Sequence, residues 1–230
     1  MKRILTVLIL CLFAVPSCLW AASGLELICD ARTIANHLMD GDLQKALDIS
    51  IECEDRILMN PNANFADQIL KADYLVSAQI LTAQGSFSKA RDRLAKGKEL
   101  RDNFLIPLAD LQDTTEGYLL ERSGETETAV NFYRKIAQSY ALVRLGAIYL
   151  DQGHTDDAHR VIVDSLKYNP SDPAAHAILG EILEASDKSA ALQEYKRALA
   201  LATQGNPTVV ALVYIEVGRA KRGIARLQQQ

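Results

Sequence analysis

Two histidines and two aspartates lie close together near residue 155, and these residue types are common metal ligands. His154 and His159 flank Asp156 and Asp157. A separation of five residues places the two histidines about 140° apart around a helix, so they do not share a face. We therefore interpret this stretch as a polar, solvated turn, and the sequence predicts no metal site.

Cys29 and His37 are the best candidates for a nucleophile and its base. They lie eight residues apart, which is more than two turns of a helix and out of hydrogen-bond reach. The chain has no glycine-rich phosphate loop, no His-Glu-x-x-His and no Gly-x-Ser-x-Gly. We expect neither an enzyme nor a cofactor.

A run of six cations near residues 89–101 could contact nucleic acid. Asp92, Glu99 and Asp102 interrupt this run, and the whole chain carries a net charge of −4. A mixed run on an acidic chain is typical of a solvated helix face rather than of a phosphate-binding surface. The cations are Lys89, Arg91, Arg93, Lys96, Lys98 and Arg101.

The first 21 residues have the pattern of an export signal. Lys2 and Arg3 precede an apolar stretch over residues 4–15, which is too short to span a bilayer. Pro16 ends this stretch, and Ala21 offers a small residue for cleavage. We predict a signal peptide over residues 1–21 and a periplasmic location. An uncleaved membrane anchor is the alternative.

Cys18 leaves a third alternative open. Val15-Pro16-Ser17-Cys18 resembles a bacterial lipobox, although proline at its second position departs from the pattern. The mature protein would then be an outer-membrane lipoprotein with a lipid anchor at Cys18. Labelling with radioactive palmitate that is lost in Cys18→Ala would distinguish this lipoprotein from a cleaved periplasmic protein.

One turn signature recurs along the rest of the chain, a glycine followed by an alanine five residues later. Glycine accepts the left-handed conformation that ends a helix, and alanine one turn into the next helix allows two helices to approach closely. A fifth copy has Ser186 in place of glycine, before Ala191. The four glycine copies are Gly41 with Ala46, Gly85 with Ala90, Gly124 with Ala129, and Gly153 with Ala158.

The helix before the turn also repeats. Leu179-Gly180 follows Leu145-Gly146 by 34 residues, with Tyr149 and a late Pro170 in the first of these units. This pattern resembles the tetratricopeptide repeat, a helical hairpin of 34 residues. The resemblance implies an all-α, right-handed solenoid of about five hairpins. Their predicted bounds are about 27–60, 71–104, 110–138, 139–172 and 173–205. An irregular all-α domain with coincident glycines is the alternative.

A last helix is expected over about 208–226. It ends in Arg219, Lys221, Arg222 and Arg226. We interpret it as a capping helix that covers the open end of the array, with cations favourable near its C-terminus. The alternative is a binding site for an acidic partner or a lipid headgroup.

Cys29 and Cys53 lie about twelve residues on either side of Gly41, so an antiparallel hairpin brings them together. Removal of the signal peptide leaves these two cysteines in an oxidising compartment, which favours a disulfide. Closing a loop of about 25 residues would stabilise the outermost repeat, which has one neighbour, by about 3.5 kcal/mol. Two buried free thiols are the alternative.

The resemblance implies a binding module whose concave face holds a peptide or an amphipathic helix of another protein. We expect Tyr118 and Tyr140 to anchor this partner; packing of both rings against the adjacent hairpin is the alternative. The face is predicted to consist of Leu111, Tyr118, Glu121, Tyr140, Val143, Arg144, Ala147, Leu150 and Glu181.

The predicted function is a non-catalytic interaction scaffold of a bacterial cell envelope. A lipid-tethered outer-membrane assembly or pilus-biogenesis subunit is the alternative. No group of residues in the sequence supports a hydrolase acting on cell-wall or peptide substrates.

Overall fold

The computed structural model describes residues 30–61, 66–100, 109–136, 139–204 and 211–229. The predicted signal peptide, Cys18 and Cys29 lie outside these residues. All regular structure in the described residues is helical, which confirms the predicted all-α solenoid. The helices are α3 (Ala31–Asp40), α4 (Leu43–Leu58), α5 (Ala66–Ala83), α6 (Phe87–Glu99), α7 (Ala109–Arg122), α8 (Thr126–Ile136), α9 (Ser139–Asp151), α10 (Thr155–Tyr168), α11 (Pro173–Leu183), α12 (Lys188–Gln204) and α13 (Ala211–Gln228).

The recurring turns have the predicted conformation. Their four glycines have φ values of 81°, 78°, 95° and 78°, in the left-handed region where a side chain would be strained. The alanine that follows each of them is completely buried. The turn at Ser186 lacks the glycine but has an aspartate cap like that of the Gly41 turn: Asp187 accepts a hydrogen bond from the amide of Ala190 at 2.9 Å, as Asp42 does from the amide of Lys45. These turns set the two helices of each hairpin antiparallel and close together.

Inside the hairpins, a glycine of the first helix receives a large side chain of the second. A Cβ atom added at Gly180 would lie 2.5 Å from Cδ1 of Tyr195, and one added at Gly146 would lie 2.5 Å from Cδ1 of Ile162. Tyr195 and Ile162 are both completely buried. Gly117 receives Tyr133 in the same way. The glycine at this position is therefore a packing requirement of the last three hairpins.

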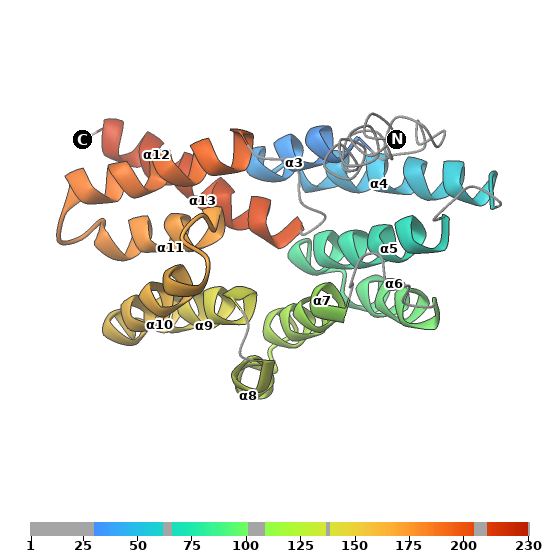
Figure 1. The fold of residues 1–230 in the computed structure, drawn as a ribbon, viewed down its shortest axis with the longest axis horizontal. Helices are drawn as coiled ribbons and strands as arrows, with labels where there is room; N and C mark the ends of the chain where they lie inside the picture. The colour runs from blue at the N-terminus through green and yellow to red at the C-terminus, as the bar shows by residue number, and fades with distance from the viewer. Residues whose placement is uncertain (1–29, 62–65, 101–108, 137–138, 205–210, 230) are drawn as a thin grey trace, which may run out of the picture.

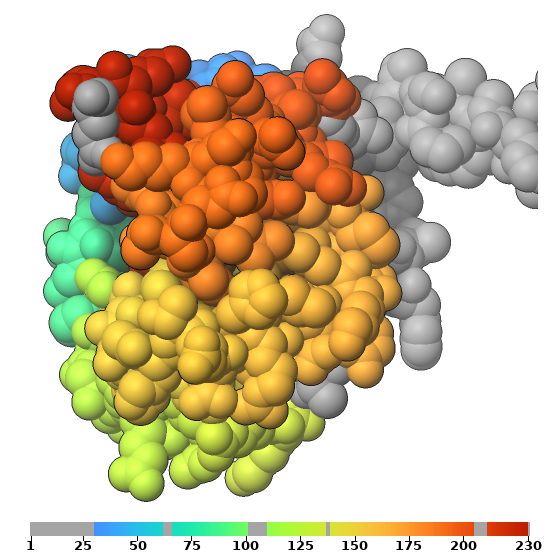
Figure 2. All heavy atoms as spheres, turned by 90° about the vertical axis from the view of Figure 1, so that its left-hand side faces the viewer, coloured from blue at the N-terminus to red at the C-terminus, as the bar shows by residue number. Residues whose placement is uncertain are grey.

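The hairpins form an arch that returns to its own start (Figure 1). The helices α5, α7, α9 and α11 pack in sequence along its interior, which corresponds to the predicted concave face. Figure 2 shows three consecutive hairpins stacked in chain order, from α7 and α8 through α9 and α10 to α11 and α12. The last helix, α13, packs against α11 and α12 as a capping helix would, and also against α3 and α5.

The first hairpin is held to the end of the chain. Arg32 donates a hydrogen bond to the carbonyl oxygen of Ala202 at 2.9 Å, and Lys221 pairs with Asp40 at 2.5 Å. The apolar side chains of α3 and α13 share one core cluster. The expectation that the outermost repeat has one neighbour is therefore wrong, since this hairpin packs against α5 through α4 and against α13 through α3.

Cys53 is completely buried on α4. Its proposed partner, Cys29, lies outside the described residues, so the bridge stays a prediction. None of the described helices is long and apolar enough to cross a membrane.

A buried carboxylate lies between the first two hairpins. Asp73 on α5 is 5% exposed and accepts a hydrogen bond from the Ser50 hydroxyl at 2.6 Å. Burial raises its pKa to about 7; the Ser50 hydrogen bond lowers it, Glu54 raises it further, and Arg93 lowers it. Glu54 and Arg93 form an ion pair beside it.

This pKa predicts a stability that falls as the pH rises. Between about pH 4 and pH 7 the folded protein holds a proton on Asp73 that the unfolded chain has released, so each step up in pH disfavours folding. We expect Asp73→Asn to raise the free energy of unfolding by about 2–3 kcal/mol at pH 8 and by little at pH 4. Urea unfolding at several pH values measures this, with the exposed Asp67→Asn on the same helix as control. An effect independent of pH would contradict the assignment.

Candidate functional site

Arg144 on α9 lies at the centre of the arch and is 3% exposed. Its guanidinium donates two hydrogen bonds to Glu121 on α7, from Nε at 3.2 Å and from Nη2 at 2.5 Å. Its third nitrogen, Nη1, pairs with Glu216 on α13. The planar fork of arginine makes both contacts at once. One side chain therefore joins three helices that are distant in the sequence.

Tyr118 lies beneath this guanidinium. The Cζ atom of Arg144 is 5.0 Å from the centre of the Tyr118 ring, within the range of a cation–π contact. Tyr118 is 4% exposed, and burial raises the pKa of its hydroxyl to about 12. The ring is therefore a neutral, packed part of the interior.

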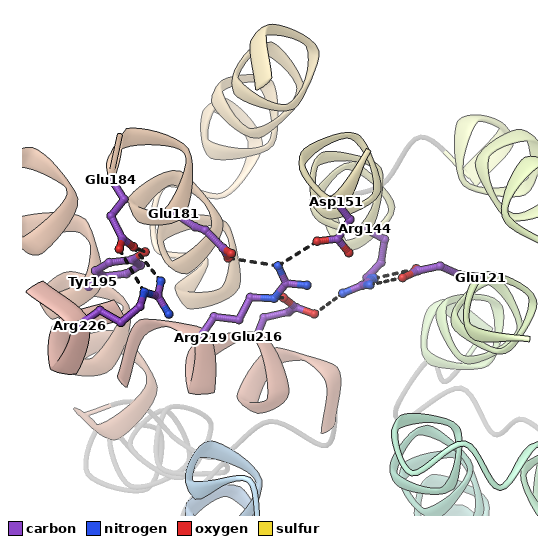
Figure 3. A network of polar contacts seen from close by, with 9 residues as sticks. All are labelled: Glu121, Arg144, Asp151, Glu181, Glu184, Tyr195, Glu216, Arg219 and Arg226. Carbon is purple, nitrogen blue, oxygen red and sulfur yellow. Dashed lines mark hydrogen bonds and ion pairs between the residues drawn. The ribbon is translucent and has the colours of Figure 1, made fainter. Parts of the chain in front are cut away.

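Arg219 on α13 extends the contacts toward α9 and α11. It lies 2.8 Å from Glu216, 3.1 Å from Glu181 and 3.4 Å from Asp151. Figure 3 shows the resulting chain of charges across the interior. We call it the interior charge network, and its members are Glu121, Arg144, Asp151, Glu181, Glu216 and Arg219.

The charges of this network stabilise one another. Burial by itself would raise the pKa of Glu216, but the positive charges of Arg219 and Arg144 outweigh burial and hold this pKa below its usual value. Glu216 in turn raises the pKa of Arg219. All three groups are thus ionised at neutral pH. A neutral hydrogen-bond network would not have this electrostatic cohesion.

A second buried polar contact joins the first turn of α13 to the interior of the arch. The side chain of Gln79 on α5 is completely buried and accepts a hydrogen bond from the amide of Leu212 at 3.1 Å. Its amide nitrogen donates to the hydroxyl of Thr115 on α7 at 2.8 Å. Gln79 therefore joins α13 to α7, as Arg144 does.

The cations at the end of α13 pair within the chain. Arg226 donates to Glu184 at 2.7 Å, and Glu184 also accepts a hydrogen bond from the Tyr195 hydroxyl at 2.7 Å. Arg219 and Lys221 have carboxylate partners as well. These contacts favour the capping helix over a basic binding site, because three of the four cations already have acidic partners.

The predicted concave face is covered in this structure. Leu111, Tyr118, Val143, Arg144 and Ala147 are buried. The other four predicted residues are half-buried, so none of the nine forms an exposed surface; they are Glu121, Tyr140, Leu150 and Glu181.

Two contacts bury these residues. Leu111 and Tyr118 share a core cluster with α13, which also contacts Arg144 and Glu181 directly, whereas Val143 and Ala147 pack against α10 and α11. The expectation of an open groove anchored by Tyr118 is therefore wrong for this conformation. Tyr118 packs in the interior, in agreement with the alternative that both rings are packing residues. Tyr140 packs against the core cluster that contains Tyr118.

Sequence reasoning missed Glu216, Arg219 and Asp151 as members of the site. Glu216 left a signal, since it is the single charge in the apolar run from Val209 to Val217. An isolated charge in such a run on a buried helix requires a partner charge. The identity of that partner, 72 positions away, could come only from the tertiary arrangement.

The two histidines near residue 155 lie at the start of α10. His154 is the N-cap of α10, and His159 is exposed on the first turns of that helix. Across the described residues, no three His, Cys, Asp or Glu side chains are grouped as metal ligands would be.

Comparison with known proteins identifies the repeats. Residues 143–206 match the family model described as tetratricopeptide repeat. The curated protein CTR9 homolog of Arabidopsis thaliana is 30% identical over 145 residues, and the match covers 59% of this chain but 13% of that protein.

Among solved structures, YrrB, described as a TPR protein with an unusual peptide-binding site, is 15% identical over 81% of this chain and 91% of its own, with a TM-score of 0.37. MamA is 16% identical over 70% of this chain and 90% of its own, with a TM-score of 0.36.

Removing the centre of the network should destabilise the whole arch. In Arg144→Met, the carboxylates of Glu121 and Glu216 remain close to each other without the guanidinium between them. We expect the free energy of unfolding to fall by about 3–5 kcal/mol, the usual effect of breaking a buried ion pair. Denaturant unfolding measures this. The matched control is Arg134→Met, since Arg134 is exposed and its contact is with the Tyr149 hydroxyl. Equal effects of the two variants would contradict the central role of Arg144.

Proposed function

We propose that this chain, a tetratricopeptide-repeat protein, is a non-catalytic scaffold that binds a helix of another protein on its concave face. Proteins with these repeats bind other proteins or peptides, and the present chain has the repeats and the solenoid that they build. The helix-binding part of the proposal is supported by one observation. The concave face already contacts a helix, α13, through Arg144 on α9 and Glu181 on α11.

The chemistry of this face suits an amphipathic helix. It offers a buried guanidinium at its centre and carboxylates at Asp151 and Glu181 on its rim. A small residue, Ala177 on α11, shares a buried cluster with Ala220 of α13 and allows a helix backbone to approach. Helix-in-groove recognition uses this combination of an apolar contact surface with a few placed charges.

We further propose that the scaffold acts in the envelope of a bacterial cell. This part of the proposal depends on the leader-like residues 1–21 and on Cys18. With a cleaved leader the protein would be periplasmic, and with a lipid at Cys18 it would be tethered to the outer membrane. Both cases place the concave face outside the cytoplasm.

Site-specific photo-crosslinking in cells tests the proposed face. A photoreactive residue at Leu150, half-buried on α9 next to Asp151, should capture one defined protein, and the crosslink should map to a helical segment of it. The matched control is position Tyr168, 76% exposed at the end of α10. Capture at Tyr168 but not at Leu150 would place the binding surface on the outside of the arch and contradict the proposal.

A further inference from the structure

The polar side of α13 contacts α9 and α11 of the concave face through charged groups. Glu216 contacts Arg144, and Arg219 contacts Glu181 and Asp151. The apolar side of the same helix shares one core cluster with α3, α5 and α7 and a second cluster with α11 and α12, so it also packs against the concave face. The two sides differ in what separation would do to them. Charged side chains that leave the interior become hydrated, whereas apolar side chains would need another apolar surface.

A permanent core has little reason to bury this many charges. Bringing Glu216 and Arg144 out of water carries a large desolvation penalty, which their mutual attraction only roughly offsets, and apolar side chains of similar size often stabilise a protein as well or better. Arg144 also keeps its two hydrogen bonds to Glu121 if Glu216 leaves. The face that remains would therefore still hold an oriented guanidinium, aimed at the position of a missing carboxylate.

From this geometry we propose that α13 is an exchangeable internal ligand, and that the partner is a helix with the same charge pattern. This inference rests on the proposed function and names the partner class for that site. The partner helix carries an acidic residue that meets Arg144 and an arginine three residues later that meets Glu181 and Asp151. It also carries an apolar face equivalent to Leu212, Val213 and Val217, which are buried in α13.

Competition between such helices has a defined consequence. With one helix bound within the chain, the apparent affinity of any external helix equals its intrinsic affinity multiplied by the fraction of time that the face is open. A substitution that weakens only the internal helix raises that fraction. Glu216→Gln is such a change, because it removes the charge that α13 presents to Arg144 and leaves every residue of α7, α9 and α11 unchanged.

A labelled peptide with the sequence of residues 211–228 is the probe, and the full chain is its target. Fluorescence anisotropy should show that the Glu216→Gln chain binds this peptide at least tenfold more tightly than the unchanged chain does. Arg222→Gln is the matched control, since Arg222 is exposed on the same helix and also loses one charge. That control chain should bind as the unchanged chain does. A peptide carrying Glu216→Gln should bind the Glu216→Gln chain at least tenfold more weakly than the original peptide.

Equal peptide affinities for the three chains, or no binding to any of them, would overturn the exchange. If Glu216→Gln does not give a folded monomer, Arg219→Gln weakens the same helix from the rim and carries the same expectation. The photo-crosslink at Leu150 separates the two proposals. Capture of a partner without peptide exchange would support the proposed scaffold function and refute the proposal that α13 is an exchangeable internal ligand. Peptide exchange without capture would support the internal ligand and refute binding of a second protein at this face.

Discussion

The buried guanidinium of Arg144 is the constraint on which the arrangement of the arch depends. It lies where α7, α9 and α13 meet, and it pairs with a carboxylate from each of the other two helices, Glu121 on α7 and Glu216 on α13. A desolvated charge tolerates little displacement from its partners, because each loses far more without the other than a solvated pair would. The position of α9 thus determines how α7 and α13 approach each other.

Most of the remaining architecture follows from local rules that repeat. Glycine with positive φ turns the chain, and alanine brings the helices close. A second glycine then accepts a tyrosine or an isoleucine from the facing helix. Each rule acts within one hairpin. Stacked hairpins alone would give an open array, and the contact of α13 with α3 closes it.

This division explains what could be predicted from the sequence. The hairpins were predictable because Gly153 with Ala158, and Leu145-Gly146 with Leu179-Gly180, are signals read over short distances. The closed interior was not predictable in the same way. Whether Tyr118 points into a groove or beneath an arginine depends on where α13 returns, and no local pattern encodes that path. Glu216 signalled only that some partner charge had to exist.

The closure covers the concave face with a helix of the same chain, and the proposed exchange of α13 would regulate access to that face. An open array presents its concave side continuously, whereas here the last described helix contacts that side through charged groups as well as apolar ones. The charged groups are stable when they are paired and become hydrated when they are exposed. An external helix with the same pattern could therefore replace α13 without leaving unpaired charges in the interior.

A double-mutant cycle between Arg144 and Glu216 tests this account most directly. Unfolding free energies of the unchanged chain, Arg144→Met, Glu216→Gln and the double variant give the coupling between the two side chains. Direct pairing across the interior predicts a coupling of about 1.5 kcal/mol or more, as measured for close buried charge pairs. A coupling below about 0.5 kcal/mol would mean that the two residues act independently, and it would contradict the closure of the arch by this contact.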